Sequence, residues 1–169
     1  PAAAQDWRVR REGAEITVRA PDPAPPRISG VAPRSAASAA DLLGRLEAAV
    51  LRANSELRAL IRKYSALYGV PEDLVHRVVI RESRHRPGAR NGRYYGLMQM
   101  APATARGMGY SGSPQGLLDA ETNLKYGVKY LRGAYMVADG DFNDSVKWYS
   151  KGYYYEAKRK GLLKATGLR

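Results

Sequence analysis

The sequence contains no cysteine and only two histidines, His76 and His85. Without cysteine, a disulfide framework, a thiolate metal site and thiol catalysis are all excluded. Two histidines are also too few for a multi-histidine metal centre. We therefore expect the protein to work without a metal ion or another cofactor.

Long apolar runs are also absent. No stretch approaches the roughly 20 apolar residues that a helix needs to cross a bilayer, because Arg, Asp or Gly interrupts each aliphatic segment within a few positions. The first six residues, Pro-Ala-Ala-Ala-Gln-Asp, have neither the basic nor the apolar part of a secretory signal. We expect a soluble chain without a transmembrane segment, and this end carries no signal peptide from which export could be inferred.

Acidic residues are outnumbered, since 28 Lys and Arg stand against 16 Asp and Glu, which gives a formal charge of +12. Such an excess predicts attraction to an anionic partner, which could be nucleic acid, a membrane surface or an acidic cell-wall polymer. The basic residues are spread along the whole chain, and no helix-turn-helix, zinc-finger or RNA-binding motif accompanies them. Nucleic acid is therefore not the expected partner.

The 169 residues are enough for one domain with a sizeable core and one appended segment. Six of the ten prolines lie within the first 33 residues, four of them between positions 21 and 26, which favours an extended linker. Alternating apolar residues around Glu12-Gly13 would suit a small hairpin, although two short strands are marginal alone. We expect residues 1–37 to form an extended or weakly ordered arm and residues 38–169 to form one domain.

From Ser38 onward, apolar residues recur at spacings of three and four, which predicts an all-α domain. Ser38 followed by Asp41 is typical of a helix N-terminus, and Gly69 followed by Pro71 is typical of one helix ending and another beginning. Residues 87–95 are rich in Gly, Arg and Asn and are expected to form a loop. The predicted helices cover residues 41–68, 71–85, 104–108, 121–138, 142–151 and 156–163.

Glu82 ends an apolar stripe on the second predicted helix. Four aliphatic residues precede it by eight, seven, four and three positions and so share its face: Leu74, Val75, Val78 and Val79. Desolvation on such a face raises the pKa of a carboxyl group, which is what a general acid needs near neutral pH. The alternative is structural, with Glu82 capping the helix end or pairing with a neighbouring arginine.

Three blocks of sequence together resemble the catalytic domain of the soluble lytic transglycosylases. The first surrounds Glu82, the second is distinctive, and the third leads into the helix predicted at 121–138; the resemblance covers roughly residues 61–163. The blocks read Ile80-Arg81-Glu82-Ser83-Arg84, Gly96-Leu97-Met98-Gln99-Met100 and Leu118-Asp119-Ala120-Glu121-Thr122-Asn123.

The resemblance implies a helical fold like that of goose-type lysozyme, acting on peptidoglycan glycan strands. Such enzymes cut the bond between N-acetylmuramic acid and N-acetylglucosamine and leave 1,6-anhydromuramic acid ends. Glu82 falls on the family's catalytic glutamate, which serves first as acid and then as base, and the substrate's acetamido group assists. Tyr149 falls on a tyrosine whose hydroxyl lies against that glutamate. The positions that shape the groove or touch the substrate are Ser83, Met98, Gln99 and Met100.

The sequence departs from the family around Tyr149. Ser150 stands where the family has Asn, and Ser offers one donor in place of an amide pair. Ser150 is still a candidate substrate-binding residue, but the contacts on its side of the groove differ from those of the family. Three tyrosines follow at positions 153–155, where the family has a glycine-rich turn, and packing is favoured for them over stacking on sugar rings.

Two other functions stay open. A non-catalytic peptidoglycan-binding module is favoured only by the altered Ser150 block. A hydrolytic muramidase on the same fold would need a second carboxylate, for which Asp139, Asp141 and Asp144 are candidates. The resemblance implies a location in the periplasm or cell envelope. We also expect the protein to be a monomer. A short basic chain also suits local opening of the wall for a secretion or flagellar apparatus, which is one of the family's roles.

Overall fold

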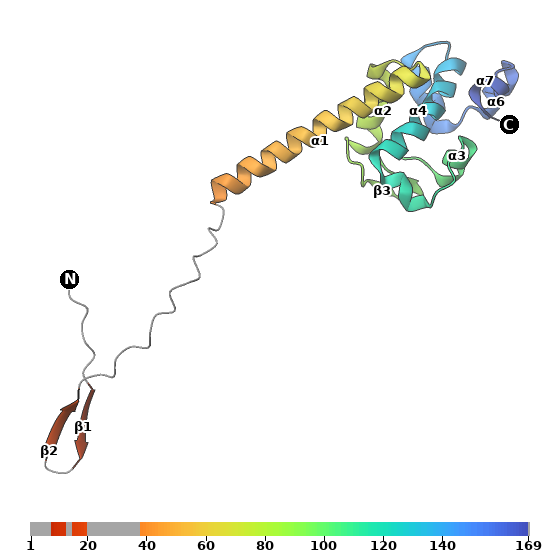
Figure 1. Ribbon diagram of the computed structural model, residues 1–169. Helices are drawn as coiled ribbons and strands as arrows, with labels where there is room; N and C mark the ends of the chain where they lie inside the picture. The colour runs from red at the N-terminus through yellow and green to blue at the C-terminus, as the bar shows by residue number, and fades with distance from the viewer. Residues whose placement is uncertain (1–7, 13–14, 20–37, 169) are drawn as a thin grey trace. The chain divides into compact units, whose positions relative to one another are not determined.

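The computed structural model describes residues 8–12, 15–19 and 38–168 (Figure 1). The chain divides into two compact units, Pro1–Leu42 and Leu43–Arg169. The proline-rich segment 21–33, which was expected to be extended, lies outside the described residues. In the first unit, β1 (Arg8–Glu12) pairs with β2 (Glu15–Arg19) in an antiparallel hairpin, so the alternation around Glu12-Gly13 does correspond to a hairpin.

The long helix α1 (Ala39–Tyr68) begins with the predicted cap. The Ser38 hydroxyl accepts a hydrogen bond from the Asp41 backbone N–H at 3.1 Å, and the Asp41 carboxylate accepts one from the Ser38 N–H at 3.0 Å. This reciprocal pair satisfies two backbone donors that the first turn would otherwise leave free. The helix ends before Gly69, whose φ of +62° is the left-handed conformation that glycine adopts without steric cost.

The remaining elements are short helices and one small hairpin. The predicted helices at 71–85, 104–108, 121–138 and 142–151 are all present, with ends shifted by a few residues or fewer. The elements are α2 (Glu72–Ser83), β3 (Arg90–Asn91), β4 (Tyr94–Tyr95), α3 (Pro102–Gly107), the 3₁₀ helix η1 (Pro114–Leu118), α4 (Ala120–Val137), α5 (Phe142–Lys151), α6 (Tyr154–Arg159) and α7 (Leu163–Thr166).

The single helix predicted at 156–163 is wrong. The chain forms α6 and α7 instead, and Gly161 lies between them with a φ of +71°, which interrupts a right-handed helix. The tyrosine run divides as well. Tyr153 is buried and donates its hydroxyl to the Tyr130 carbonyl at 2.8 Å, whereas Tyr154 and Tyr155 are exposed. Packing therefore accounts for the first of the three tyrosines only.

The core of the second unit forms around α4, which packs most extensively on α5. The apolar face of α4 is fully buried and includes Leu124, Val128 and Leu131. Two glycines in this helix allow close approach: a Cβ at Gly127 would lie 2.5 Å from the Met98 sulfur, and one at Gly133 would lie 2.2 Å from the Tyr153 hydroxyl. The all-α prediction is confirmed, and no helix among the described residues is long and apolar enough to cross a membrane.

Candidate active site

Glu82 lies in the last turn of α2, at the end of a completely buried stripe. The four aliphatic residues that share its face are all inaccessible to solvent: Leu74, Val75, Val78 and Val79. The helix stops one residue later, because Arg84 and the following His85 both adopt positive φ, at 52° and 60°. Two successive non-glycine residues in this region turn the chain sharply. Glu82 is thereby held at the boundary between the core and the solvent.

The Glu82 carboxyl group is half-buried, with 24% of its side chain exposed. Burial raises its pKa, and the nearby Arg81 charge opposes that rise to a smaller extent. The Arg81 Nε lies 3.8 Å from Glu82 Oε1, and more than half of the arginine side chain is exposed, so the pair contributes little stability. No hydrogen bond fixes the carboxyl among the residues the structure describes. It is therefore available to exchange a proton with a ligand.

The loop of residues 96–100 is built on Asn123, a fully buried residue in the first turn of α4. Its Oδ1 accepts a hydrogen bond from the Met98 N–H at 2.8 Å, and its Nδ2 donates to the carbonyl oxygens of Tyr95 and Leu117 at 2.8 and 2.7 Å. Gly96 is required at the start of the loop, because a Cβ there would lie 2.4 Å from Asn123 Nδ2. One amide side chain thus sets the path of the loop.

The role of Asn123 was missed in the sequence. The residue belongs to the third block of the resemblance, but a polar residue near a helix start reads first as a capping or surface group. The available signal was its immediate neighbour Leu124 and the apolar spacing that follows, which place position 123 close to the buried face. A buried amide needs partners, and here it finds them in backbone groups of a separate loop.

Tyr149 reaches the same loop from α5. Its buried hydroxyl donates a hydrogen bond to the Met98 carbonyl at 2.8 Å and lies 3.3 Å from the Met100 sulfur. Tyr130 of α4 packs edge-to-face against its ring, with centroids 5.4 Å apart. Burial raises the pKa of Tyr149 well above its ordinary value, and the Glu82 charge raises it further. Tyr149 therefore remains a protonated donor, close enough to Glu82 to respond to its charge.

Gln99 occupies an unusual backbone position, with a φ of 48°. Its Nε2 donates to the carbonyl oxygens of Gly96 and Ala89, at 2.8 and 3.1 Å, and the side chain is only partly buried. No hydrogen bond reaches its Oε1 from the described residues, which leaves an oriented acceptor for a ligand donor. Gln99 is the one position of the 96–100 loop that is not buried.

The other candidate residues support the loop or lie beside it. Met98 and Met100 are buried, at 0% and 2% exposure. Ser83 is buried as well, and its hydroxyl donates to the Val79 carbonyl one turn earlier. Ser150 is exposed on α5, and its hydroxyl donates to the Val146 carbonyl of its own helix. Of the predicted site residues, Glu82 and Gln99 are thus the two whose side chains combine partial exposure with uncommitted acceptor atoms.

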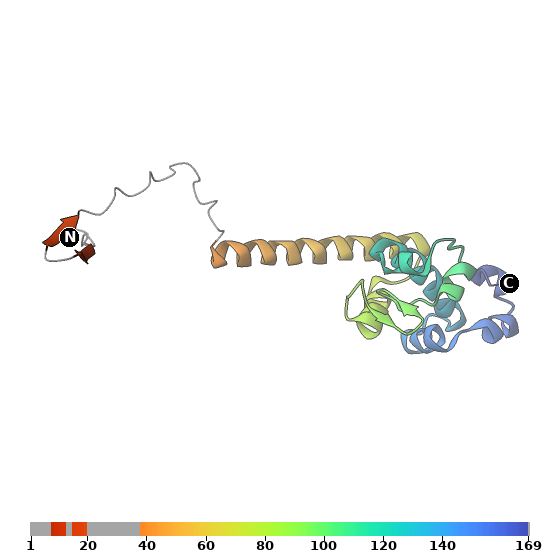
Figure 2. The same ribbon diagram turned by 90° about the horizontal axis from the view of Figure 1, so that it is seen from below.

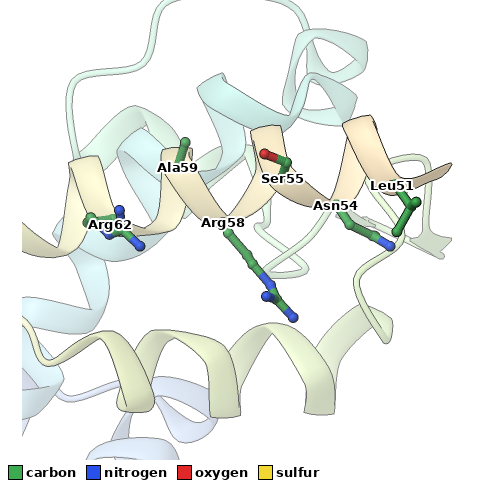
Figure 3. A pocket seen from close by; sticks show the side chains of 6 residues that line it. All are labelled: Leu51, Asn54, Ser55, Arg58, Ala59 and Arg62. Carbon is green, nitrogen blue, oxygen red and sulfur yellow. The ribbon is translucent and has the colours of Figure 1, made fainter. Parts of the chain in front are cut away.

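A cavity of about 390 Å³ lies along α1, and none of the predicted site residues lines it. Its lining comes from this helix alone: Leu51, Asn54, Ser55, Arg58, Ala59 and Arg62. Figure 3 shows Arg58 extending from α1 toward α2. The Arg58 charge contributes to lowering the pKa of His85, so the guanidinium group approaches the turn that follows Glu82.

Residues 59–165 match the family model of the transglycosylase SLT domain, which covers more than half of the chain. The chain therefore belongs to the SLT transglycosylase domain family, and it has the mostly helical, lysozyme-like architecture expected of such a domain. Membership associates the chain with lytic transglycosylase-type action on peptidoglycan in general. No solved structure matches the chain significantly.

Proposed function

We propose that the protein is an active lytic transglycosylase that cleaves the bond between N-acetylmuramic acid and N-acetylglucosamine, with Glu82 as its acid and base. The observation that carries the proposal is the setting of Glu82. Burial raises the pKa of this carboxyl, and no hydrogen bond within the described residues commits it to a structural role. Tyr149, held by the 96–100 loop, is close enough to respond to its charge.

The reaction needs one proton to move twice. Protonated Glu82 gives its proton to the glycosidic oxygen as the bond to muramic acid C1 breaks, and the N-acetylglucosamine side leaves with a free hydroxyl group. The resulting carboxylate then takes the proton of the muramyl 6-hydroxyl while that oxygen bonds to C1. The ring closes as a 1,6-anhydro sugar, no water is consumed, and Glu82 returns to its protonated state.

A tethered nucleophile has a large advantage in this site. The 6-hydroxyl belongs to the same sugar as C1, so its effective concentration at C1 exceeds that of free water. Gln99 supports the geometry, because two backbone carbonyls fix its carboxamide and its Oε1 accepts no hydrogen bond from the described residues. We assign Gln99 to orienting a sugar hydroxyl or acetamido group, and Tyr149 to holding the loop and the site beside Glu82.

The hydrolytic alternative requires a second carboxylate that holds a water or attacks C1. The three candidates are engaged elsewhere. Asp141 caps α5 by accepting the Asp144 N–H at 2.8 Å, Asp144 itself lies 3.6 Å from Lys147, and Asp139 pairs with Lys160. None of them forms a hydrogen bond or ion pair with Glu82 or Tyr149 within the described residues. This distribution favours intramolecular attack over hydrolysis.

A purely binding function is less well supported. A binding function does not require the raised pKa of the Glu82 carboxyl. The one sequence feature that favoured it is Ser150 in place of the family's Asn, and the Ser150 hydroxyl forms a hydrogen bond within its own helix. We further propose action in the periplasm or cell envelope, where the substrate of the family lies. Service to a secretion or flagellar apparatus, and function as a monomer, are extensions of the same proposal.

Mass analysis of products from purified sacculi tests the reaction directly. Anhydro ends are one water lighter than hydrolysed ends and cannot be reduced by borohydride. We expect 1,6-anhydromuropeptides to predominate. Predominantly reducible muramic acid ends would replace the proposal with a muramidase, and the absence of cleavage on every wall preparation would favour a binding module.

A further inference from the structure

The stretch that follows Glu82 is basic and contains no acid. Residues 83–118 include no Asp or Glu, and four arginines fall within ten positions of this stretch. We call these four residues the arginine rim: Arg84, Arg86, Arg90 and Arg93. All four are exposed, and none pairs with a carboxylate in the part of the chain that the structure describes. Four positive charges without acidic neighbours create a local positive potential, which favours an external anion.

Contacts within the fold restrict most of the rim arginines and leave some of their N–H donors without a partner. Arg86 Nε donates to the Ser83 carbonyl at 3.0 Å, directly beside Glu82. The Arg90 guanidinium group lies 4.9 Å from the centre of the Tyr95 ring, and that of Arg93 lies 5.4 Å from the centre of the Tyr94 ring. Arg90 Nε also donates to the Gly92 carbonyl at 3.3 Å, and Arg93 Nη2 donates to the Tyr94 hydroxyl at 3.4 Å, so the other N–H groups of both side chains remain for a ligand. Three of the four rim arginines, Arg86, Arg90 and Arg93, thus have a contact that restricts the side chain.

Backbone contacts tie the rim to the candidate active site. The Ala89 carbonyl accepts hydrogen bonds from the Gly96 N–H at 2.7 Å and from Gln99 Nε2 at 3.1 Å. Strands β3 and β4 pair Arg90 with Tyr95, immediately before the 96–100 loop. The arginines therefore keep a fixed relation to the loop that also contacts Tyr149.

We propose that the arginine rim binds the carboxylates of the stem peptide carried by the muramic acid beside the cleaved bond. The proposal rests on the proposed function, because it takes the substrate to be peptidoglycan. The stem peptide is attached to the same sugar whose C1 reacts, so its carboxylates lie close to the cleavage site. Guanidinium groups match carboxylates with two parallel hydrogen bonds, which makes arginine well suited to this ligand.

A wall phosphodiester has related chemistry, and the reaction itself argues against it. Ring closure needs a free 6-hydroxyl on the muramic acid, and an anionic polymer attached at that oxygen would remove the nucleophile. Every unit that can be cleaved keeps its stem peptide or has lost it to an amidase. The rim therefore selects peptide-bearing strands over bare glycan.

The test compares cleavage of peptide-bearing strands with cleavage of strands stripped by an amidase. The rim variant is Arg90→Gln/Arg93→Gln, and the matched control is Lys158→Gln/Lys164→Gln, which removes the same charge from α6 and α7. These helices lie at the other end of the domain from β3 in both views (Figures 1 and 2). We expect the rim variant to lose about tenfold or more in kcat/KM on peptide-bearing strands and less than about twofold on stripped strands.

Activity on stripped strands also reports whether the variant is folded. A second variant, Arg90→Lys/Arg93→Lys, keeps the positive charges but cannot form the two parallel hydrogen bonds of a guanidinium group. It is expected to have a kcat/KM on peptide-bearing strands between those of wild type and the glutamine variant. Equal losses on both substrates, or no loss on either, would overturn the rim as a peptide site. Wall phosphate can be removed from the sacculi by acid, and stem peptides can be removed by an amidase. If the rim variant loses activity on amidase-treated sacculi but not on phosphate-free sacculi, the rim binds phosphate and the proposal is contradicted.

Binding separates this inference from the proposed function. The Glu82→Gln protein is expected to bind peptide-bearing sacculi more tightly than stripped glycan, and the rim substitutions are expected to remove that difference. If wild type cleaves nothing while rim-dependent binding persists, the catalytic proposal fails and the rim stands. If wild type cleaves both substrates equally well and binding shows no preference, the rim fails and catalysis stands.

Discussion

The hydroxyl of Tyr149 donates a hydrogen bond to the carbonyl oxygen of Met98, at 2.8 Å and across 51 positions of the chain. The N–H of the same Met98 donates to the Asn123 side chain, also at 2.8 Å. Side chains of α4 and α5 thus form hydrogen bonds with both backbone polar groups of Met98, the N–H and the carbonyl. The segment that presents Gln99 is positioned by two side chains, and each of them can be tested.

Glu82→Gln is expected to preserve the fold and to lower the rate of wall cleavage by at least about a hundredfold, because the amide cannot give or take the proton. Glu47→Gln removes the same charge from an exposed position on α1 and serves as the control. Since burial raises the pKa of the Glu82 carboxyl, the ionised form is disfavoured in the folded state, so Tm at pH 7 is expected to be kept or increased. A parallel loss of helical circular dichroism and activity would instead make Glu82 structural.

The pH profile of kcat/KM is expected to fall on its alkaline side as Glu82 loses its proton. Because burial raises the pKa of this carboxyl, the fall should come at higher pH than for an exposed glutamate. Arg81→Gln removes the charge that lowers this pKa and is expected to move the fall to still higher pH. Arg106→Gln, on α3, is the control and should leave the profile in place; a profile that ignores Arg81 would contradict the assignment.

Tyr149→Phe is expected to reduce activity and to lower the free energy of unfolding by about 1–3 kcal/mol, since the buried Met98 carbonyl loses its donor. Tyr130→Phe provides the comparison. Tyr130 contributes its ring to Tyr149 and Tyr153, but its hydroxyl forms no hydrogen bond within the described residues. Chemical denaturation and cleavage assays on both variants measure the two effects. Equal losses of stability and activity in the two variants would mean that the hydrogen bond from Tyr149 to Met98 makes no specific contribution.

Asn123→Ala is expected to cost about 3 kcal/mol or more, because it leaves one backbone N–H and two carbonyl oxygens without partners in the interior. The same substitution at the exposed Asn54 of α1 is expected to change stability by no more than about 0.5 kcal/mol. Thermal unfolding measures both. A mild effect at position 123 would show that the 96–100 loop keeps its path without the amide.

Removal of residues 1–34 is expected to leave catalysis largely unchanged, because Glu82, Gln99 and Tyr149 all belong to the unit Leu43–Arg169. The shortened chain keeps Ser38 and the cap of α1. A deeper deletion through Lys63 removes the buried Ile61 and is expected to lower Tm. A large drop in activity after the short deletion, with Tm unchanged, would mean that the arm contributes to the groove.

The sequence by itself determined the α-helices between residues 39 and 151, their order and the position of Glu82 on the second of them. The reason is that these features depend on neighbours within one or two turns: Ser38 caps through Asp41, Gly69 ends α1, and the apolar face of α2 leads to Glu82 at helical spacing. The end of the chain was predicted less well. A period of three and four continues through Gly161, and only its left-handed backbone divides α6 from α7.

Tertiary structure alone decided what the polar groups do. Asn123 is a loop organiser because three backbone groups from distant segments converge on it, and Ser150 is satisfied within its own helix although its position suggested a ligand contact. The arginine rim is visible as a composition, but its relation to the site depends on the Ala89 carbonyl that joins it to Gln99. Helical periodicity depends on residues that are close in the sequence and can be recognised there. The partner of a hydrogen bond between distant segments is determined only when those segments pack together.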